Sequence, residues 1–591
     1  MKFSLDKNRI KELILFWALA SILILPQLNN VHYDPLPQFW AEMTVAWTTL
    51  ILFILIILFF KEISLPPIIF PVAIFAIYLS IQQFFVKIDF VGLSYIASSE
   101  FFLCIIAAIS INSLLEKYGK EKIFSVIAYA FTIGAILQSI IGFIQYTGTY
   151  KHFGSLIFYD SAHPTTNIFG HFGQRNHYCD YISIAIFGLI YLFNTKKIKL
   201  GLFMPILFWL IFSMTIAASR SVFIYFFIAA IISGAFYALN RNSQIYRNIF
   251  ITIITVSAFL IAFEYAYPLL EHIFSKHQQI NSGIERITSD YSASGVTGRR
   301  LVEWKKAWIV FKENPILGYG LNEFSKKSIM LQYLFPNAPE NDGLFTNCHN
   351  LILQLLAETG ILGTTILLAG MLYSLYFLVK SREIEDLFIL CMFFTIFAHS
   401  MVEYPLWYTY FLIPFVMFLA MGKSSYKISS NVAIMISGIP LILIIYLIIN
   451  GSIIFNTIVY YNDAPDNISD FKDQSSYLKN LASSNILWTY PAYYSLDNYM
   501  NVDDTSTNKT FSIKSQLEFE EKFTGFHPYP DNLIKLAKLN WILGNKEIAE
   551  NQVKLALVSY PVYQKSYISS LTEKHGKYDP LLKIAKDYSY K

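Results

Sequence analysis

The chain of 591 residues has little charge, since Asp, Glu, Lys and Arg make up 15% of it, whereas soluble domains average about 25%. The net charge of +4 and the lack of a basic run argue against a nucleic-acid partner. No Walker A, dinucleotide-binding or H-E-x-x-H motif occurs, so neither a cofactor nor a bound metal is expected. Because 55% of the residues are hydrophobic and the mean hydropathy is +0.45, the composition indicates a membrane protein.

Cysteine is also scarce, and the four cysteines are widely separated in the sequence, at Cys104, Cys179, Cys348 and Cys391. They form neither a C-x-x-C pair nor a metal-binding spacing. We therefore expect buried free thiols and no structural disulfide.

The apolar residues gather in runs of about 20, the length that crosses about 30 Å of hydrocarbon. These runs predict an all-α polytopic membrane protein with about thirteen transmembrane helices. The predicted spans are 12–30, 44–60, 66–86, 91–115, 122–146, 177–194, 200–218, 221–239, 248–268, 349–379, 385–401, 405–422 and 432–456. The first lacks a small-residue cleavage site, so we expect a retained signal anchor.

The distribution of Lys and Arg predicts the orientation, because positive charge favours cytoplasmic loops. With the N-terminus in the cytoplasm, the inner loops carry seventeen Lys and Arg and the short outer loops only four, namely Lys87, Lys151, Arg175 and Arg220. We therefore expect an inner-membrane protein whose C-terminus is periplasmic.

The same topology predicts two parts. Residues 1–456 form the membrane domain, which includes a large periplasmic loop at 269–348, and residues 457–591 form a periplasmic tail. In the tail, helical apolar spacing around Leu543-Gly544 resembles one tetratricopeptide unit. A lone helical hairpin would explain this spacing equally well.

Polar residues that are costly near hydrocarbon lie at the predicted outer ends of the spans. In HFGQRNH at 171–177, Gln174 and Asn176 either cap the next helix or belong to a site. Arg220 lies between two spans, where an arginine either snorkels to the interface or binds an anion.

The large loop and the last spans supply three more candidates. Arg300 and Trp304 share a helix face, which either lies on the membrane or holds a guanidinium for bidentate phosphate binding. His349 lies at the outer interface and is either a general base or a helix-capping or merely interfacial histidine. Glu403 either orients His349 or an arginine, or pairs with Arg175 or with the arginine between the seventh and eighth spans.

These motifs resemble the O-antigen ligase and polymerase superfamily, specifically the PglL-type protein O-oligosaccharyltransferases. The matching segments are FGQRNH at 172–177, R-x-x-x-W and P-x-x-G-x-G within 300–320, HNLILQLLAETGILG at 349–363, and HSMVEYPLWYTYFLIPF at 399–415. Arg175 stands where that branch often has proline, so the resemblance implies no role for it.

The resemblance implies transfer of an oligosaccharide from undecaprenyl-diphosphate to a Ser or Thr of a periplasmic protein, a pilin being one candidate. His349 would be the catalytic base, and Arg220 and Arg300 would bind the diphosphate. Supporting roles fall to Gln174, Asn176, Asn350, Glu403 and Tyr404.

Two other functions stay open. An O-antigen ligase or polymerase would use the same chemistry on a lipid A-core or glycan acceptor. A transporter of lipid-linked sugar would need charges along a central path and internal repeats, which the sequence does not show.

Overall fold

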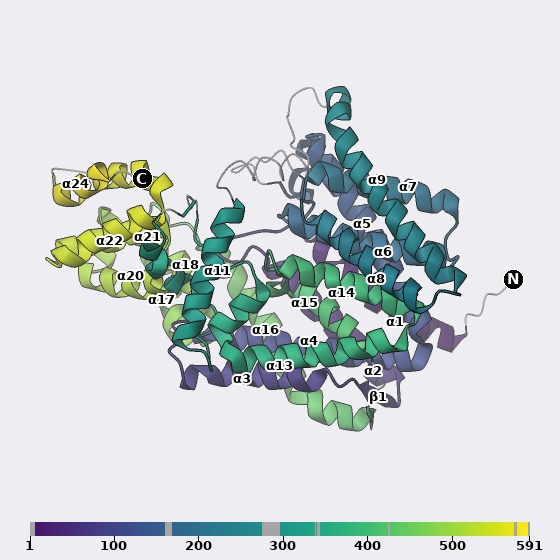
Figure 1. Ribbon diagram of the computed structural model, residues 1–591. Coiled ribbons are helices and arrows are strands. Elements are labelled where there is room, and N and C mark those ends of the chain that lie inside the picture. The colour runs from purple at the N-terminus through teal and green to yellow at the C-terminus, as the bar shows by residue number, and fades with distance from the viewer. Residues whose placement is uncertain are drawn as a thin grey trace.

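The computed structural model describes residues 6–159, 168–274, 296–336, 338–339, 343–422, 426–572 and 576–588. The described chain is helical apart from one two-stranded sheet (Figure 1). Each predicted span overlaps a helix, although their ends differ by up to six residues. These helices are α1 (Lys7–Ile24), α2 (Phe39–Phe59), α3 (Ile69–Ile81), α4 (Val91–Tyr118), α5 (Lys120–Tyr146), α6 (Arg175–Asn194), α7 (Leu200–Ala217), α8 (Val222–Leu239), α9 (Gln244–Phe274), α13 (Leu351–Ser381), α14 (Ile384–Ser400), α15 (Thr409–Ala420) and α16 (Ser430–Tyr460).

Length and hydropathy identify this as a multi-pass membrane protein. Within the described residues, eight helices are long and apolar enough to cross a membrane, namely α2, α4, α5, α7, α8, α9, α13 and α16. The segments Ile69–Phe84 and Thr409–Ala420 are apolar but shorter. The total of thirteen spans stays a prediction.

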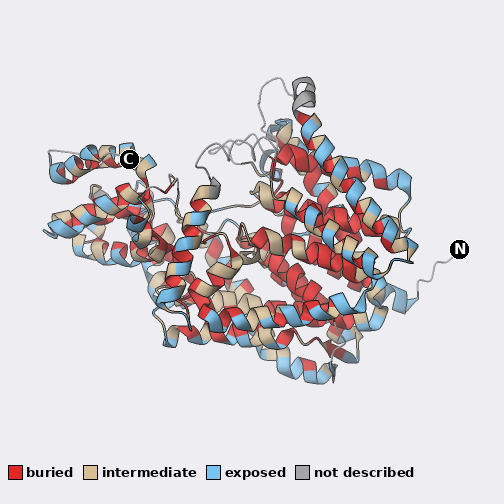
Figure 2. Ribbon diagram, in the orientation of Figure 1, coloured by how far each residue is buried: buried red, intermediate tan, exposed pale blue. Residues whose placement is uncertain are grey.

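Burial follows the arrangement expected of a helix bundle in lipid. In Figure 2, buried residues concentrate on the inner helices α5, α6 and α14, whereas the outward faces of α9 and α16 are exposed. On α16, Ile439 is 81% exposed and Ile442 is 70% exposed. Such apolar residues on the outer face are suited to hydrocarbon rather than to water. All four cysteines are free and buried, as predicted.

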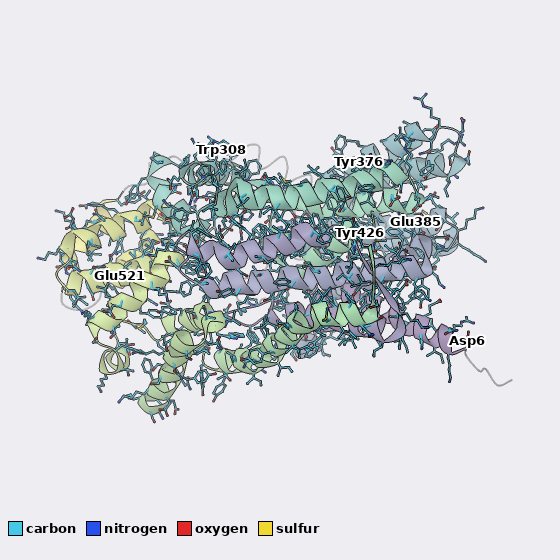
Figure 3. The ribbon with its side chains drawn as sticks, turned by 90° about the horizontal axis from the view of Figure 1, so that it is seen from below. Asp6, Trp308, Tyr376, Glu385, Tyr426 and Glu521 are labelled. Atoms are coloured by element: carbon cyan, nitrogen blue, oxygen red, sulfur yellow. The ribbon has the colours of Figure 1, made fainter. Side chains whose placement is uncertain are left out.

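Loops that the charge pattern predicts for the same membrane face are in contact with one another. Strand β1 (Glu62–Leu65) pairs antiparallel with β2 (Tyr426–Ser429), a sheet that the sequence analysis did not predict. Lys120 bonds to Asp386 at 2.9 Å, and Lys197 to Glu121 at 2.7 Å. Figure 3 shows Asp6, Glu385 and Tyr426 toward one end of the molecule and Glu521 toward the other. This segregation supports the predicted alternation of the spans.

The large loop contributes helices α11 (Val296–Glu313) and α12 (Phe324–Met330), and the segment between them packs against a kink in α13. The kink is at Gly360, whose φ is 64°. The Tyr319 amide donates to the Ala357 carbonyl at 2.8 Å, and the Ile361 amide to the Pro315 carbonyl at 2.8 Å. The P-x-x-G-x-G segment thus ties the end of α11 to α13.

We predict that Gly318→Ala destabilises this junction by more than about 1 kcal/mol, because its φ of +73° disfavours an L side chain and a Cβ would lie 2.3 Å from the Glu358 backbone. Gly201→Ala is the matched control, since a Cβ there meets open space. Thermal unfolding in detergent measures both variants. Equal unfolding temperatures would contradict the packing described here.

The tail consists of short helices that pack beside the large loop, at the left of Figure 1. They are α17 (Ile468–Ser484), α18 (Thr489–Asp497), α19 (Thr505–Thr510), α20 (Ile513–Phe526), α21 (Pro530–Ile542), α22 (Lys546–Ser559), α23 (Gln564–Leu571) and α24 (Asp579–Asp587). Helices α21 and α22 form a hairpin across Gly544, whose φ is 84°. A tetratricopeptide unit stays a prediction. Phe90, before α4, packs against Tyr490 and Phe526, so the tail is anchored on the membrane part.

Short 3₁₀ helices complete the described chain. They are η1 (Pro26–Leu28), η2 (Gln82–Phe84), η3 (Thr149–His152), η4 (Gly154–Leu156), η5 (Leu331–Leu334), η6 (Pro405–Trp407), η7 (Ile486–Trp488) and η8 (Pro561–Tyr563). Among them η6 directly follows Glu403 and Tyr404, which belong to the site described next.

Candidate functional site

His349 lies in the turn that leads into α13, with a left-handed backbone of φ 57°. This conformation is uncommon for histidine. Its neighbours hold it, because the Cys348 amide donates to Gln354 Oε1 at 2.7 Å and Asn350 Oδ1 accepts from the Leu353 amide at 3.1 Å. Asn350 is therefore the helix cap, so the capping alternative for His349 is wrong.

The Glu403 carboxylate gathers three of the predicted site residues. Glu403 Oε2 lies 2.9 Å from His349 Nδ1. Glu403 Oε1 accepts from Arg300 Nη2 and, at 3.3 Å, from Asn176 Nδ2. The side chain of Glu403 is 6% exposed, against 20% for Arg300 and 17% for His349. The nearly buried carboxylate of Glu403 thus orients Arg300 and His349, whose side chains are partly exposed.

The surroundings of Glu403 keep it ionised. Burial alone would raise its pKa, but the hydrogen bond with His349 and the charge of Arg300 outweigh burial and lower the pKa to about 2. The ionised carboxylate can in turn only accept a hydrogen bond, so the Nδ1 atom of His349 carries the hydrogen in this contact. This leaves Nε2 as the basic ring nitrogen, the arrangement that a general base requires.

We predict that Glu403→Gln lowers stability most at neutral pH. A carboxyl whose folded pKa is about 2 and whose ordinary value is 4.5 stabilises the fold above pH 4.5. That contribution falls as the pH drops from 4.5 toward 2. Unfolding temperatures of wild type and variant should therefore converge as the pH is lowered, and a pH-independent difference would contradict the ion pairing.

Asn176 connects this cluster to the turn that contains Arg220. Asn176 Oδ1 accepts a hydrogen bond from Ser219 Oγ at 2.9 Å, and Arg220 follows Ser219 directly. Asn176 lies in the first turn of α6, and Arg220 lies between the end of α7 and the start of α8. The structure therefore brings Asn176, Arg300, His349 and Glu403 into direct contact and places Arg220 on the turn beside them.

The remaining predicted residues are Tyr404, Asn350 and Gln174. Tyr404 packs edge-on against the His349 ring at 5.1 Å, and Asn350 Nδ2 donates to the Met401 carbonyl at 3.3 Å. Gln174 is the first residue of the α6 terminus but makes no capping bond with its side chain. Gln174 nevertheless occupies the N-cap position of α6, where its carbonyl accepts from the Tyr178 amide at 3.1 Å. No described hydrogen bond joins it to Glu403, so its part in the site stays a prediction.

Arg299, beside Arg300, faces the interior of the large loop instead of the site. It pairs with Glu303 at 2.7 Å, and Glu303 also bonds Lys306 at 2.9 Å. The guanidinium lies over the Phe345 ring at 5.4 Å, and Phe345 packs against His349 at 5.1 Å. Arg299 thus holds α11 and one wall of the His349 site.

The sequence analysis missed one buried pair, Asp180 and His399. A signal was present, because Asp180 follows Asn176 by four residues and so shares its helix face. An ionisable residue inside an apolar span is by itself a reason to look for a role.

Three family models match parts of the chain. Residues 182–368 match the O-antigen ligase family and residues 168–193 match the protein glycosylation ligase family. Residues 387–571 match the C-terminal part of the virulence factor membrane-bound polymerase family. Together these matches cover residues 168–368 and 387–571, which include every site residue.

Two curated relatives from Acinetobacter baylyi also match. A general O-oligosaccharyltransferase is 22% identical over 307 residues, which cover 50% of each chain. A ComP-specific O-oligosaccharyltransferase is 27% identical over 357 residues, covering 60% of this chain and 58% of the relative. The chain thus spans between half and three fifths of the relatives it matches.

The fold and the site define a multi-pass membrane protein with a polar cluster where its helices end. The matches confirm the resemblance predicted from the sequence. The chain is similar to PglL-type protein O-oligosaccharyltransferases of the O-antigen ligase superfamily.

Proposed function

We propose that the chain is an oligosaccharyltransferase of the bacterial inner membrane. It would move an oligosaccharide en bloc from undecaprenyl-diphosphate to a Ser or Thr hydroxyl of a periplasmic protein, with a pilin as one candidate acceptor. The observation that carries the proposal is the single carboxylate, Glu403, that holds both Arg300 and His349.

The proposed reaction is a direct displacement. His349 Nε2 takes the proton of the acceptor hydroxyl as its oxygen attacks the anomeric carbon of the first sugar. The bond from that carbon to the phosphate oxygen breaks, and undecaprenyl-diphosphate leaves. Arg300 and Arg220 offset the charge on the leaving group, so the proposed step needs no metal.

Two apolar cavities beside the site support a lipid-linked donor. One of about 270 Å³ lies among α3, α4, α13 and α15, and one of about 470 Å³ lies among α2, α4 and α16. Trp407 lines both, four residues after Glu403. An isoprenoid chain in either cavity would start beside the proposed diphosphate site.

We propose that residues 457–591 form a periplasmic domain that binds the acceptor protein. The tail packs against α12 of the large loop through Ile329, and α12 follows α11, which carries Arg300. A protein bound to the tail would therefore lie on the side of the molecule where the large loop meets the site.

Mass spectrometry of periplasmic proteins from a deletion strain and its parent tests the proposal. We expect Ser- or Thr-linked oligosaccharide to disappear from defined peptides in the deletion strain, and to return with the wild-type gene. Unchanged glycopeptides would contradict the proposal.

The polymerase-family match at 387–571 favours one alternative, transfer to a lipid A-core or glycan acceptor. That function predicts altered lipopolysaccharide or glycan length in the deletion strain, with unchanged glycopeptides. The same samples therefore distinguish the two functions.

A further inference from the structure

Asp180 and His399 form an ion-pair contact in the interior of the helix bundle. His399 Nδ1 lies within hydrogen-bonding distance of Asp180 Oδ2, at 2.7 Å, and both side chains are 0% exposed. The second oxygen, Asp180 Oδ1, has no hydrogen-bond partner among the described residues. Ionisable groups at membrane depth are costly, and one that is only half satisfied is poorly explained by stability alone.

The pair is connected to the site through the backbone. His399 lies in the last turn of α14, and its carbonyl accepts the Val402 amide at 3.0 Å and the Glu403 amide at 2.8 Å. The backbone of His399 therefore helps to hold the turn in which Glu403 lies. Because Asp180 holds the imidazole, it also helps to fix that turn.

Helix α6 contacts the same turn at a second place. Asn176 lies one helical turn before Asp180 and donates to Glu403 Oε1 at 3.3 Å. Between them, His177 packs edge-on against the His399 ring at 5.4 Å. Helix α6 thus holds the side chain of Glu403 through Asn176 and its backbone through Asp180 and His399.

We propose that Asp180 and His399 are positioning residues for Glu403. They hold its carboxylate where one oxygen reaches Arg300 and the other reaches His349, so a small rotation of the turn would break one of these contacts. This inference rests on the proposed function, because its readout is glycan transfer. Neither residue touches the reacting atoms.

The test measures initial rates of transfer in membranes, with lipid-linked oligosaccharide and an acceptor protein. We expect Asp180→Ala to lower the rate about 10- to 100-fold, the range for residues that orient an active group. Asp180→Asn keeps a group that can hydrogen-bond His399 Nδ1, since an amide both donates and accepts, so its rate should stay within about 5-fold of wild type.

A double-mutant cycle separates positioning from general damage to the fold. If Asp180 acts through Glu403, Asp180→Ala should cost less than about 2-fold in a Glu403→Ala background. His399→Ala should behave in the same way, and it replaces Asp180→Ala in the cycle if that variant does not accumulate. Losses that multiply independently would overturn the proposal.

Thr395→Ala is the matched control, because Thr395 is 1% exposed on α14 and its hydroxyl, among the described residues, bonds the Cys391 carbonyl one turn earlier. Its rate should stay within about 2-fold of wild type. A Thr395→Ala loss as large as that of Asp180→Ala would also overturn the proposal. A wild-type protein without transfer activity would instead refute the proposed function, so the two failures are distinguishable.

Discussion

Replacing His349 by alanine is expected to lower the initial rate of glycan transfer by a factor of about 10²–10⁴, the usual contribution of a general base. The fold should survive, because Glu403 keeps its bonds to Arg300 and Asn176. Rates are measured in membranes that contain equal amounts of each protein. A variant with more than about half of the wild-type rate would refute the role of His349 as base.

His152→Ala is the matched control for this experiment. His152 lies in η3, is exposed, and belongs to a loop predicted for the same membrane face as His349. The substitution removes the same side chain without touching Glu403. We therefore expect the wild-type rate, and a loss comparable to that of His349→Ala would show that the assay does not report on the site.

Replacing Arg300 by alanine is expected to lower transfer by about 10²–10³-fold, comparable to the loss of one donor that stabilises developing negative charge. Two contributions combine, because the guanidinium that offsets the diphosphate disappears and Glu403 Oε1 loses one of its two described donors, with Asn176 left as the other. Arg300→Lys should recover part of the rate, since lysine supplies charge without the bidentate geometry. Initial rates at several donor concentrations give kcat and KM separately.

Arg241→Ala is the matched control for Arg300→Ala, because Arg241 is an exposed arginine in a loop predicted for the opposite face. It should leave both kcat and KM unchanged. The role of Arg300 would be contradicted by a variant Arg300→Ala whose kcat/KM stays within about 3-fold of wild type.

The sequence predicted the helices well because their lengths are dictated by the hydrocarbon thickness. The spans 122–146 and 200–218 lie within two residues of α5 and α7. The β1–β2 pairing was not predictable in this way, since Ser64 pairs with Lys427 far along the chain. Four-residue strands carry too little periodicity to be told from loops.

The candidate site was predicted as a set of residues at one face, but its internal pairing was not. Charged residues such as Arg300 and Glu403 stand out in the sequence because placing a charge near hydrocarbon costs free energy, whatever their neighbours in the fold. Which of them touch depends on how the helices rotate and pack around one another, and that is decided by contacts spread over the whole bundle. The position of Arg299 illustrates this, because it adjoins Arg300 yet pairs with Glu303 in the loop interior.

The central claim is that Arg220, Arg300 and His349 surround one diphosphate-linked sugar. A structure of the protein in a lipid nanodisc with undecaprenyl-diphosphate-linked oligosaccharide tests this most directly. We predict diphosphate within hydrogen-bonding reach of Arg220 and Arg300, and the anomeric carbon facing the Nε2 side of the His349 ring. A donor bound with its diphosphate away from both arginines would contradict the mechanism.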